Sequence, residues 1–301
     1  MYKDNPLMDI DTLFEEIMFP GNTLGWDIGG NEKTVRGVTR DELVVHYRRH
    51  YSPKNMVLAV AGAVTPATRG LLEHYFGPHA AEKEALPMAH YRQSFARVRW
   101  PATAPGLSQR VAVRQKKLDQ VQFILGFPGI AYTDKNRYAL SLLSNILGGG
   151  MSSRLFVEVR EKRGLVYMIR TGVNFFRDTG TFCVQAGIDP SRLKEAVRVI
   201  RDELVKIAKA GVSPHELRDA KNNIAGGLAL SMEDCHAHAS WYANMALFYN
   251  ETITPEEQLR RLKKVTAAEV QQIARALIDL RQVRVASIGP TSKAQVLACF
   301  S

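Results

Sequence analysis

From residue 107 onward, the spacing of apolar residues predicts short strands that alternate with amphipathic helices. The predicted strands are Arg110–Arg114, Val121–Phe127, Tyr167–Phe176, Gly180–Gly187 and Val283–Ile288. The predicted helices cover about 136–147, 152–162, 191–210, 214–231, 234–248, 255–263 and 267–279. Neighbouring short strands combined with helical pairs favour an α+β fold with an antiparallel or mixed sheet, not a doubly wound one.

The N-terminal region is predicted to be mainly helical. Asp9 or Asp11 can cap a helix that runs to about Phe19. Thr39, with a glutamate three residues later, forms a capping box for a helix ending near His50. A further helix includes residues 71–76.

This region contains one convincing strand, Asn55–Ala61 (NMVLAVA). A single strand cannot satisfy the hydrogen bonds of its own ladder, and even a lone hairpin is marginal in water. Residues 1–77 are therefore expected to be half a domain whose missing strands come from elsewhere.

Four of the chain's 13 prolines fall between residues 78 and 106, where no long periodic segment occurs. This composition is typical of an interdomain linker. We therefore predict the second half of an N-terminal domain at residues 1–85, a linker at 86–106 and a complete C-terminal domain at 107–301.

Composition excludes several classes of protein. The 301 residues are 46% apolar and 23% charged, which argues against long disorder and coiled coil. No apolar stretch approaches the about 18 residues of a membrane span. The formal net charge of +10 would allow an anionic partner, but no nucleic-acid motif accompanies it. Three widely separated cysteines make a disulfide framework unexpected and favour a reducing, cytoplasmic compartment.

Two histidine groups have the composition of metal sites. His46 and His50 are four residues apart on one helical face, but the positions between them hold Tyr47 and two arginines, with no carboxylate to activate water. In the segment 235–238 (CHAH), the two histidines are two residues apart and point away from each other on a helix. Both groups are interpreted as structural, and no metal ligand is assigned.

The segment from residue 148 to residue 167 carries the most specific candidate chemistry. Gly148, Gly149 and Gly150 follow a helix, and they are either a flexible connector or a loop that contacts a substrate. Gly164 is expected to cap the next helix. Arg160 and Tyr167 would then converge at a helix–strand junction, where an arginine can hold a carbonyl or carboxylate and a tyrosine can donate to an oxyanion.

At these residues the chain resembles the zinc metallopeptidases that include insulinase, pitrilysin and the mitochondrial processing peptidase. Residues 19–64 resemble the second half of that family's N-terminal domain, and residues 146–167 (ILGGGMSSRLFVEVREKRGLVY) resemble the signature of its C-terminal domain. The segments VSPHELRDAKNNIAGGLALSMED and PEEQLRRLKKVTAAEVQQIARALI also fit.

The resemblance implies two-layer α/β domains of the processing-peptidase type, which pair around a peptide chamber. It implies zinc in the complete protein, held by an HxxEH motif and a distal glutamate in the N-terminal domain. Arg160 and Tyr167 match an Arg–Tyr pair that reaches the substrate, and Gly148–Gly150 are expected to contact it as well.

The sequence contains no HxxEH. The resemblance places the metal ligands just before Met1, so we expect an N-terminally truncated chain that binds no zinc and has negligible activity alone. Its expected partners are a peptide substrate and either the zinc-binding half or a companion peptidase subunit, in a homo- or heterodimer. Two alternatives are a non-catalytic subunit of a two-chain peptidase and a structural subunit like the core proteins of the cytochrome bc1 complex.

Overall fold

The computed structural model describes residues 4–80, 98, 100, 104–249 and 252–301. By their contacts these residues form two compact units. The first combines the described parts of Met1–Ile28, Val98–Ile224 and Arg261–Ser301, and the second combines the described parts of Gly29–Arg97 and Ala225–Arg260. The predicted linker, 86–106, lies mostly outside the described residues. The domain boundaries drawn from the sequence therefore stay a prediction.

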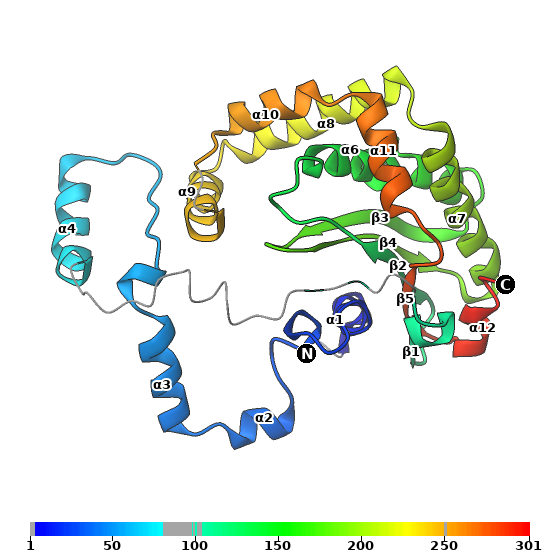
Figure 1. Ribbon diagram of the computed structural model, residues 1–301, viewed down its shortest axis with the longest axis horizontal. Helices are drawn as coiled ribbons and strands as arrows, with labels where there is room; N and C mark the ends of the chain where they lie inside the picture. The colour runs from blue at the N-terminus through cyan, green and yellow to red at the C-terminus, as the bar shows by residue number, and fades with distance from the viewer. Residues whose placement is uncertain (1–3, 81–97, 99, 101–103, 250–251) are drawn as a thin grey trace. The chain divides into compact units, whose positions relative to one another are not determined.

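A five-stranded mixed sheet forms the centre of the first unit, with the strand order β1-β5-β2-β4-β3 (Figure 1). β1 and β5 are parallel, and the other neighbours are antiparallel. This confirms the predicted α+β fold. The strands are β1 (Val111–Gln115), β2 (Val121–Pro128), β3 (Val166–Phe175), β4 (Gly180–Ile188) and β5 (Arg284–Gly289).

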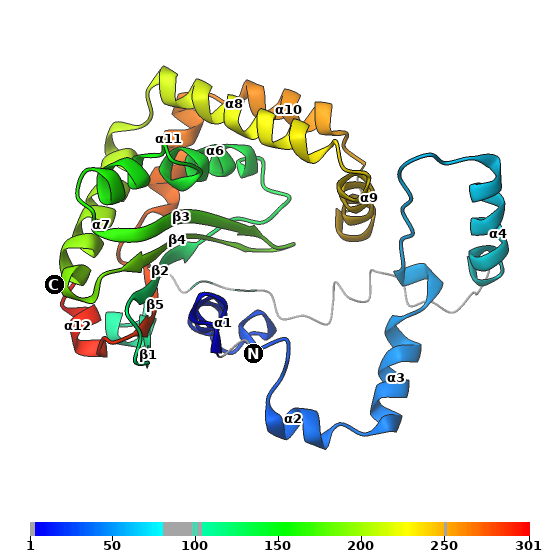
Figure 2. The same cartoon turned by 180° about the vertical axis from the view of Figure 1, so that it is seen from behind.

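Helices cover both faces of this sheet (Figures 1 and 2). On one face, α6 (Arg137–Gly148) packs against β3, and α11 (Ala267–Leu277) contacts both α6 and α7 (Leu193–Ala210). On the other face, α1 (Pro6–Met18) packs against β5 and β2. The predicted two layers are present, and α1 adds a third.

The N-terminal helix α1 begins earlier than the sequence analysis predicted. Asn5 is the cap, and its side chain accepts a hydrogen bond from the N–H of Leu7, with proline at the first helical position. The predicted cap Asp9 instead lies inside the helix, 3% exposed, and pairs with Arg114 and with Lys116 at 3.0 Å. Asp11 is not the cap either. The buried ion pairs tie α1 to the end of β1.

Two other helix starts agree with prediction. The Ser213 hydroxyl accepts the N–H of Glu216 at the start of α8, and Thr266 forms a capping box with Glu269 at the start of α11. α12 (Lys293–Leu297) belongs to the first unit, whereas α8 (Pro214–Ser231) and α10 (Pro255–Lys264) each contribute residues to both units. No helix within the described ranges is long and apolar enough to cross a membrane.

The second unit contains α2 (Glu32–Gly37), α3 (Arg40–His50), α4 (Pro66–Ala80) and α9 (Cys235–Asn244). α3 begins and ends as predicted, with the Thr39–Glu42 capping box in place. The predicted strand 55–61 does not form a ladder with any described residue. Met56 and Leu58 are 59% and 54% exposed because no neighbouring strand covers them.

Candidate functional site

The candidate site lies where the chain passes from the end of α6 to the start of β3. Between them, residues Phe156–Glu161 form a π-helical turn, in which the N–H of Lys162 bonds to the carbonyl of Val157 at 3.0 Å. Such turns are rare and are often found at functional sites. The turn packs directly against β3, so both elements contribute to one surface.

Two buried side chains fix this junction. Val159 and Leu165 are both 0% exposed, and the N–H of Leu165 bonds to the carbonyl of Val159. Gly164 lies between them with φ +57°, and its N–H bonds to the carbonyl of Arg160. This is the helix cap predicted from the sequence.

Arg160 and Tyr167 are both exposed at this fixed junction. Tyr167 is 56% exposed and lies at a β-bulge, because Val166 pairs with Ile188 while Met168 pairs with Gly187. Bulges redirect side chains and are frequent beside active sites. The guanidinium carbon of Arg160 lies over the Phe156 ring, 4.8 Å from the ring centroid.

Within the described residues, neither the Arg160 guanidinium nor the Tyr167 hydroxyl has a hydrogen-bond or ion-pair partner. The structure brings their elements together but shows no contact between the two side chains. Both groups therefore keep their hydrogen-bond donors available for a ligand.

The other cations of this turn are already paired. Glu158 binds Lys162 at 2.6 Å and Arg163 at 2.8 Å. The hydrogen bonds from Arg163 and Lys162 lower the pKa of Glu158 to about 2, so it stays ionised at neutral pH. Arg192 donates to the carbonyls of Arg163 and Gly164, at 2.9 and 3.3 Å. Among the described residues, Arg160 has no ion-pair partner, and its contact in this turn is with the Phe156 ring.

The three glycines of the loop have different environments. Gly148 is buried, and a Cβ placed there would lie 2.5 Å from the backbone nitrogen of Thr171 on β3. A Cβ on Gly149 would lie 2.6 Å from the Asn145 side chain, whereas a Cβ on Gly150 would meet nothing within 4 Å. Close packing therefore explains why glycine occupies positions 148 and 149, whereas at position 150 there is space for a larger side chain. The carbonyl of Gly150 accepts hydrogen bonds from both the N–H and the hydroxyl of Ser153.

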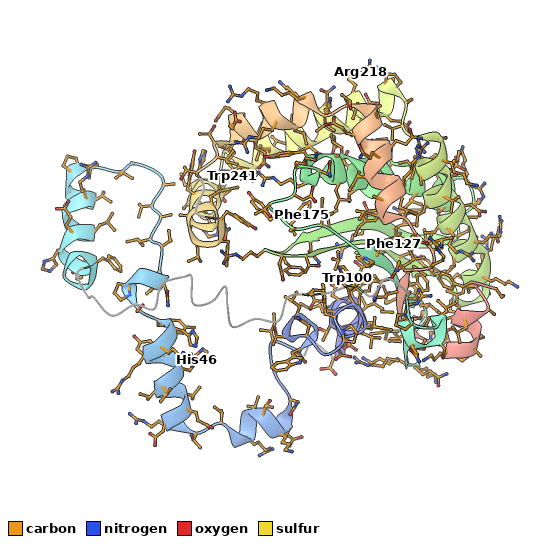
Figure 3. The ribbon with its side chains drawn as sticks, in the orientation of Figure 1. His46, Trp100, Phe127, Phe175, Arg218 and Trp241 are labelled. Atoms are coloured by element: carbon orange, nitrogen blue, oxygen red, sulfur yellow. The ribbon has the colours of Figure 1, made fainter. Side chains whose placement is uncertain are left out.

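The histidine groups do not fit a zinc site. His46, labelled in Figure 3, and His50 both lie on α3, with ring centroids 4.3 Å apart. Desolvation, together with the nearby His46 and Arg49, lowers the pKa of His50. The Asp234 side chain caps α9 through the N–H of His236. No group of three or more His, Cys, Asp or Glu side chains suited to a metal occurs in the part of the chain that the structure describes.

The sequence analysis did not single out two side chains of the segment between α6 and β3. Met151, beside Gly150, is 76% exposed. The Phe156 ring contacts the guanidinium of Arg160. The four-residue spacing of Phe156 and Arg160 was a signal that could have identified the second.

A family model described as the peptidase M16 inactive domain matches residues 37–224. The chain belongs to the M16 peptidase family. This confirms the resemblance to the insulinase-like metallopeptidases. An uncharacterized zinc protease of Streptomyces coelicolor is 35% identical over 297 residues, which cover 98% of this chain and 63% of the relative. One of Mycobacterium tuberculosis is 33% identical over 293 residues, covering 96% of this chain and 64% of the relative.

Solved structures of M16 and related proteins share the fold. A protease from Helicobacter pylori matches with a TM-score of 0.83 at 20% identity. The match covers 96% of this chain and 68% of the Helicobacter pylori chain. The peptidase M16 inactive domain from Pseudomonas fluorescens has a TM-score of 0.76 at 21% identity, covering 97% and 67%. A chain of complex III from Candida albicans has a TM-score of 0.79 at 14% identity, covering 99% and 71%. At these identities the likeness shows the fold alone.

Proposed function

We propose that this M16 chain supplies a peptide-binding surface of a zinc peptidase, and that peptide hydrolysis depends on zinc held by residues outside it. The relatives named zinc proteases support the activity of the complete protein. The described histidines do not fit a zinc site, so no catalytic step is assigned to this chain. Its partners are a peptide and the polypeptide that provides the zinc ligands, from the same protein or from a companion peptidase subunit.

The observation that supports this proposal most strongly is the pair of exposed donors, Arg160 and Tyr167, which have no hydrogen-bond partner among the described residues and lie at a junction fixed by buried side chains. The planar Arg160 guanidinium can donate two parallel hydrogen bonds to a carboxylate, or a hydrogen bond to the single oxygen of a peptide carbonyl. The Tyr167 hydroxyl can donate one more, to a peptide carbonyl or to the oxyanion that develops from it. Gly150 and Met151 are exposed in the segment between α6 and β3, and we propose that they contact the peptide backbone and apolar side chains. Substrate contact by Gly148 and Gly149 stays a prediction.

We propose a cytoplasmic location from the state of the three cysteines. Cys183, Cys235 and Cys299 are all free thiols. Free thiols persist in reducing compartments, which supports a cytoplasmic location.

Removing either donor should weaken peptide binding without unfolding the protein. We expect Arg160→Ala to weaken the affinity for a fluorescent extended peptide about 10-fold or more, because a hydrogen bond from a charged group contributes about 1.5–3 kcal/mol. Tyr167→Phe should weaken it about 2–10-fold, the contribution of one neutral hydrogen bond. Fluorescence anisotropy gives the affinities, and circular dichroism checks the fold.

Arg198→Ala is the matched control, because Arg198 is exposed on α7 and pairs with Asp202. It should leave the affinity unchanged. Equal affinity for wild type, Arg160→Ala and Tyr167→Phe would contradict the proposal and would favour a structural subunit, for which these two residues have no role.

A further inference from the structure

The Phe156 ring lies where it can control the conformation of Arg160. Both residues belong to the π-helical turn, and the guanidinium carbon is 4.8 Å from the ring centroid. Phe156 is half-buried, so its ring is a fixed support, whereas Arg160 is exposed. A guanidinium stacked on an aromatic face has that face covered, while its N–H groups, which lie in the plane, remain free at the edge.

The charges of the turn favour the same conformation. The turn contains two carboxylates, Glu158 and Glu161; Glu158 is held by Lys162 and Arg163, at 2.6 and 2.8 Å. Residues two apart on a helix do not face each other, which also separates Glu158 from Arg160. Arg160 is thus drawn toward the ring, and its donors are not consumed by a neighbouring acid.

We propose that Phe156 is a positioning residue, which holds the Arg160 guanidinium edge-outward so that it meets a peptide carbonyl or carboxylate without first being ordered. This inference rests on the proposed function, because it takes a peptide to be the ligand of Arg160. The contact between Arg160 and the Phe156 ring does not depend on which ligand binds. An arginine fixed before binding loses less side-chain entropy when the ligand arrives. Phe156 touches no ligand, and its effect acts through Arg160.

Phe156→Leu keeps apolar volume and removes the aromatic face, whereas Phe156→Tyr keeps the face. We expect Phe156→Leu to weaken peptide affinity about 2–5-fold, the range that an exposed cation–π contact provides, and Phe156→Tyr to restore it. Arg160→Lys should lower the peptide affinity by the same factor whether residue 156 is phenylalanine or leucine, because an ammonium has no plane to stack on the ring. The affinities are measured by fluorescence anisotropy on the 301-residue chain.

A second readout does not depend on a ligand. In protein labelled with ¹⁵N-arginine, the Nε–H resonance of Arg160 should be displaced by the ring current in wild type and in Phe156→Tyr, and the displacement should be lost in Phe156→Leu. Phe156→Met serves the same purpose if the leucine variant fails to fold. Unchanged Arg160 resonances in the aliphatic variants would overturn the proposal.

The two readouts separate this inference from the proposed function. If Arg160→Ala binds peptide as wild type does, the proposed function fails, and the resonance alone decides whether Phe156 positions Arg160. If Arg160→Ala loses affinity while Phe156→Leu keeps it, the positioning role is wrong and the proposed function stands.

Discussion

Gly148→Ala is expected to destabilise the first unit, which contains the five-stranded sheet, by about 2–3 kcal/mol. This value is near the top of the range for overpacking a close contact. The added Cβ would lie 2.5 Å from the backbone nitrogen of Thr171 and 2.8 Å from its Cγ2. Thr171 cannot move away easily, because it pairs with Val184 in the ladder and its hydroxyl donates to the carbonyl of Ser144 at 2.6 Å. Urea denaturation followed by circular dichroism measures the change.

Gly150→Ala is the matched control in the same loop. A Cβ at this position meets nothing within 4 Å, and the φ of Gly150 is not positive. Its effect on stability should stay within about 0.5 kcal/mol, as for other surface substitutions. Similar stabilities for the two variants would contradict the close approach of α6 to β3.

The second large effect concerns the ion pair between Arg154 and Glu216. The guanidinium contacts both carboxylate oxygens, at 2.5 and 2.9 Å, and donates to the carbonyl of Gly211. The side chains are only 17% and 29% exposed. The hydrogen bonds from Arg154, followed by those from Ser213, lower the pKa of Glu216 to about 2. The pair joins the helical turn before β3 to the start of α8.

Arg154→Met should destabilise the protein by about 2–4 kcal/mol at pH 7, because it leaves a half-buried carboxylate without its partner. A carboxyl group with a lowered folded-state pKa contributes stability above its unfolded pKa of about 4.5, and this contribution disappears as the pH falls through about 2. The difference in unfolding free energy between wild type and variant should therefore shrink steadily from pH 5 to pH 2.

Arg198→Met provides the control for this pH dependence. Arg198 and Asp202 form a pair one helical turn apart, with side chains 61% and 62% exposed. Such exposed pairs contribute about 0.5 kcal/mol or less. A pH-independent difference for Arg154→Met, or an equal effect of Arg198→Met, would contradict the assigned role of the Arg154–Glu216 pair.

Local signals in the sequence were sufficient for much of the fold. Thr39 and Glu42, three residues apart, fixed the start of α3, and short runs of apolar residues located all five strands of the sheet. These features depend on residues close together in the chain. The prediction for Gly164 succeeded for the same reason, since a positive φ at a helix end favours glycine.

Features that depend on distant residues were missed. The predicted strand at 55–61 has the right propensity but no described neighbour with which to pair. Asp9 was interpreted as a cap because its partners, Arg114 and Lys116, lie more than 100 residues away. The bulge at Tyr167 arises from its register with β4, which no local pattern encodes. At the site, Arg160 and Tyr167 were singled out by their place at a predicted helix–strand junction and by the family resemblance, and their role stays a prediction, whereas the structure was needed to distinguish Gly150 from Gly148.

The central claim is that this chain binds peptide while residues outside it hold the catalytic zinc. Its most direct test is a single titration of the purified 301-residue chain with an internally quenched fluorescent peptide. It is carried out once with a chelator and once with one equivalent of zinc, and it records binding and cleavage together. The account predicts the same affinity in both conditions and no cleavage in either. Stoichiometric zinc uptake with peptide cleavage that the chelator abolishes would contradict it, because the catalytic metal site would then lie within this chain.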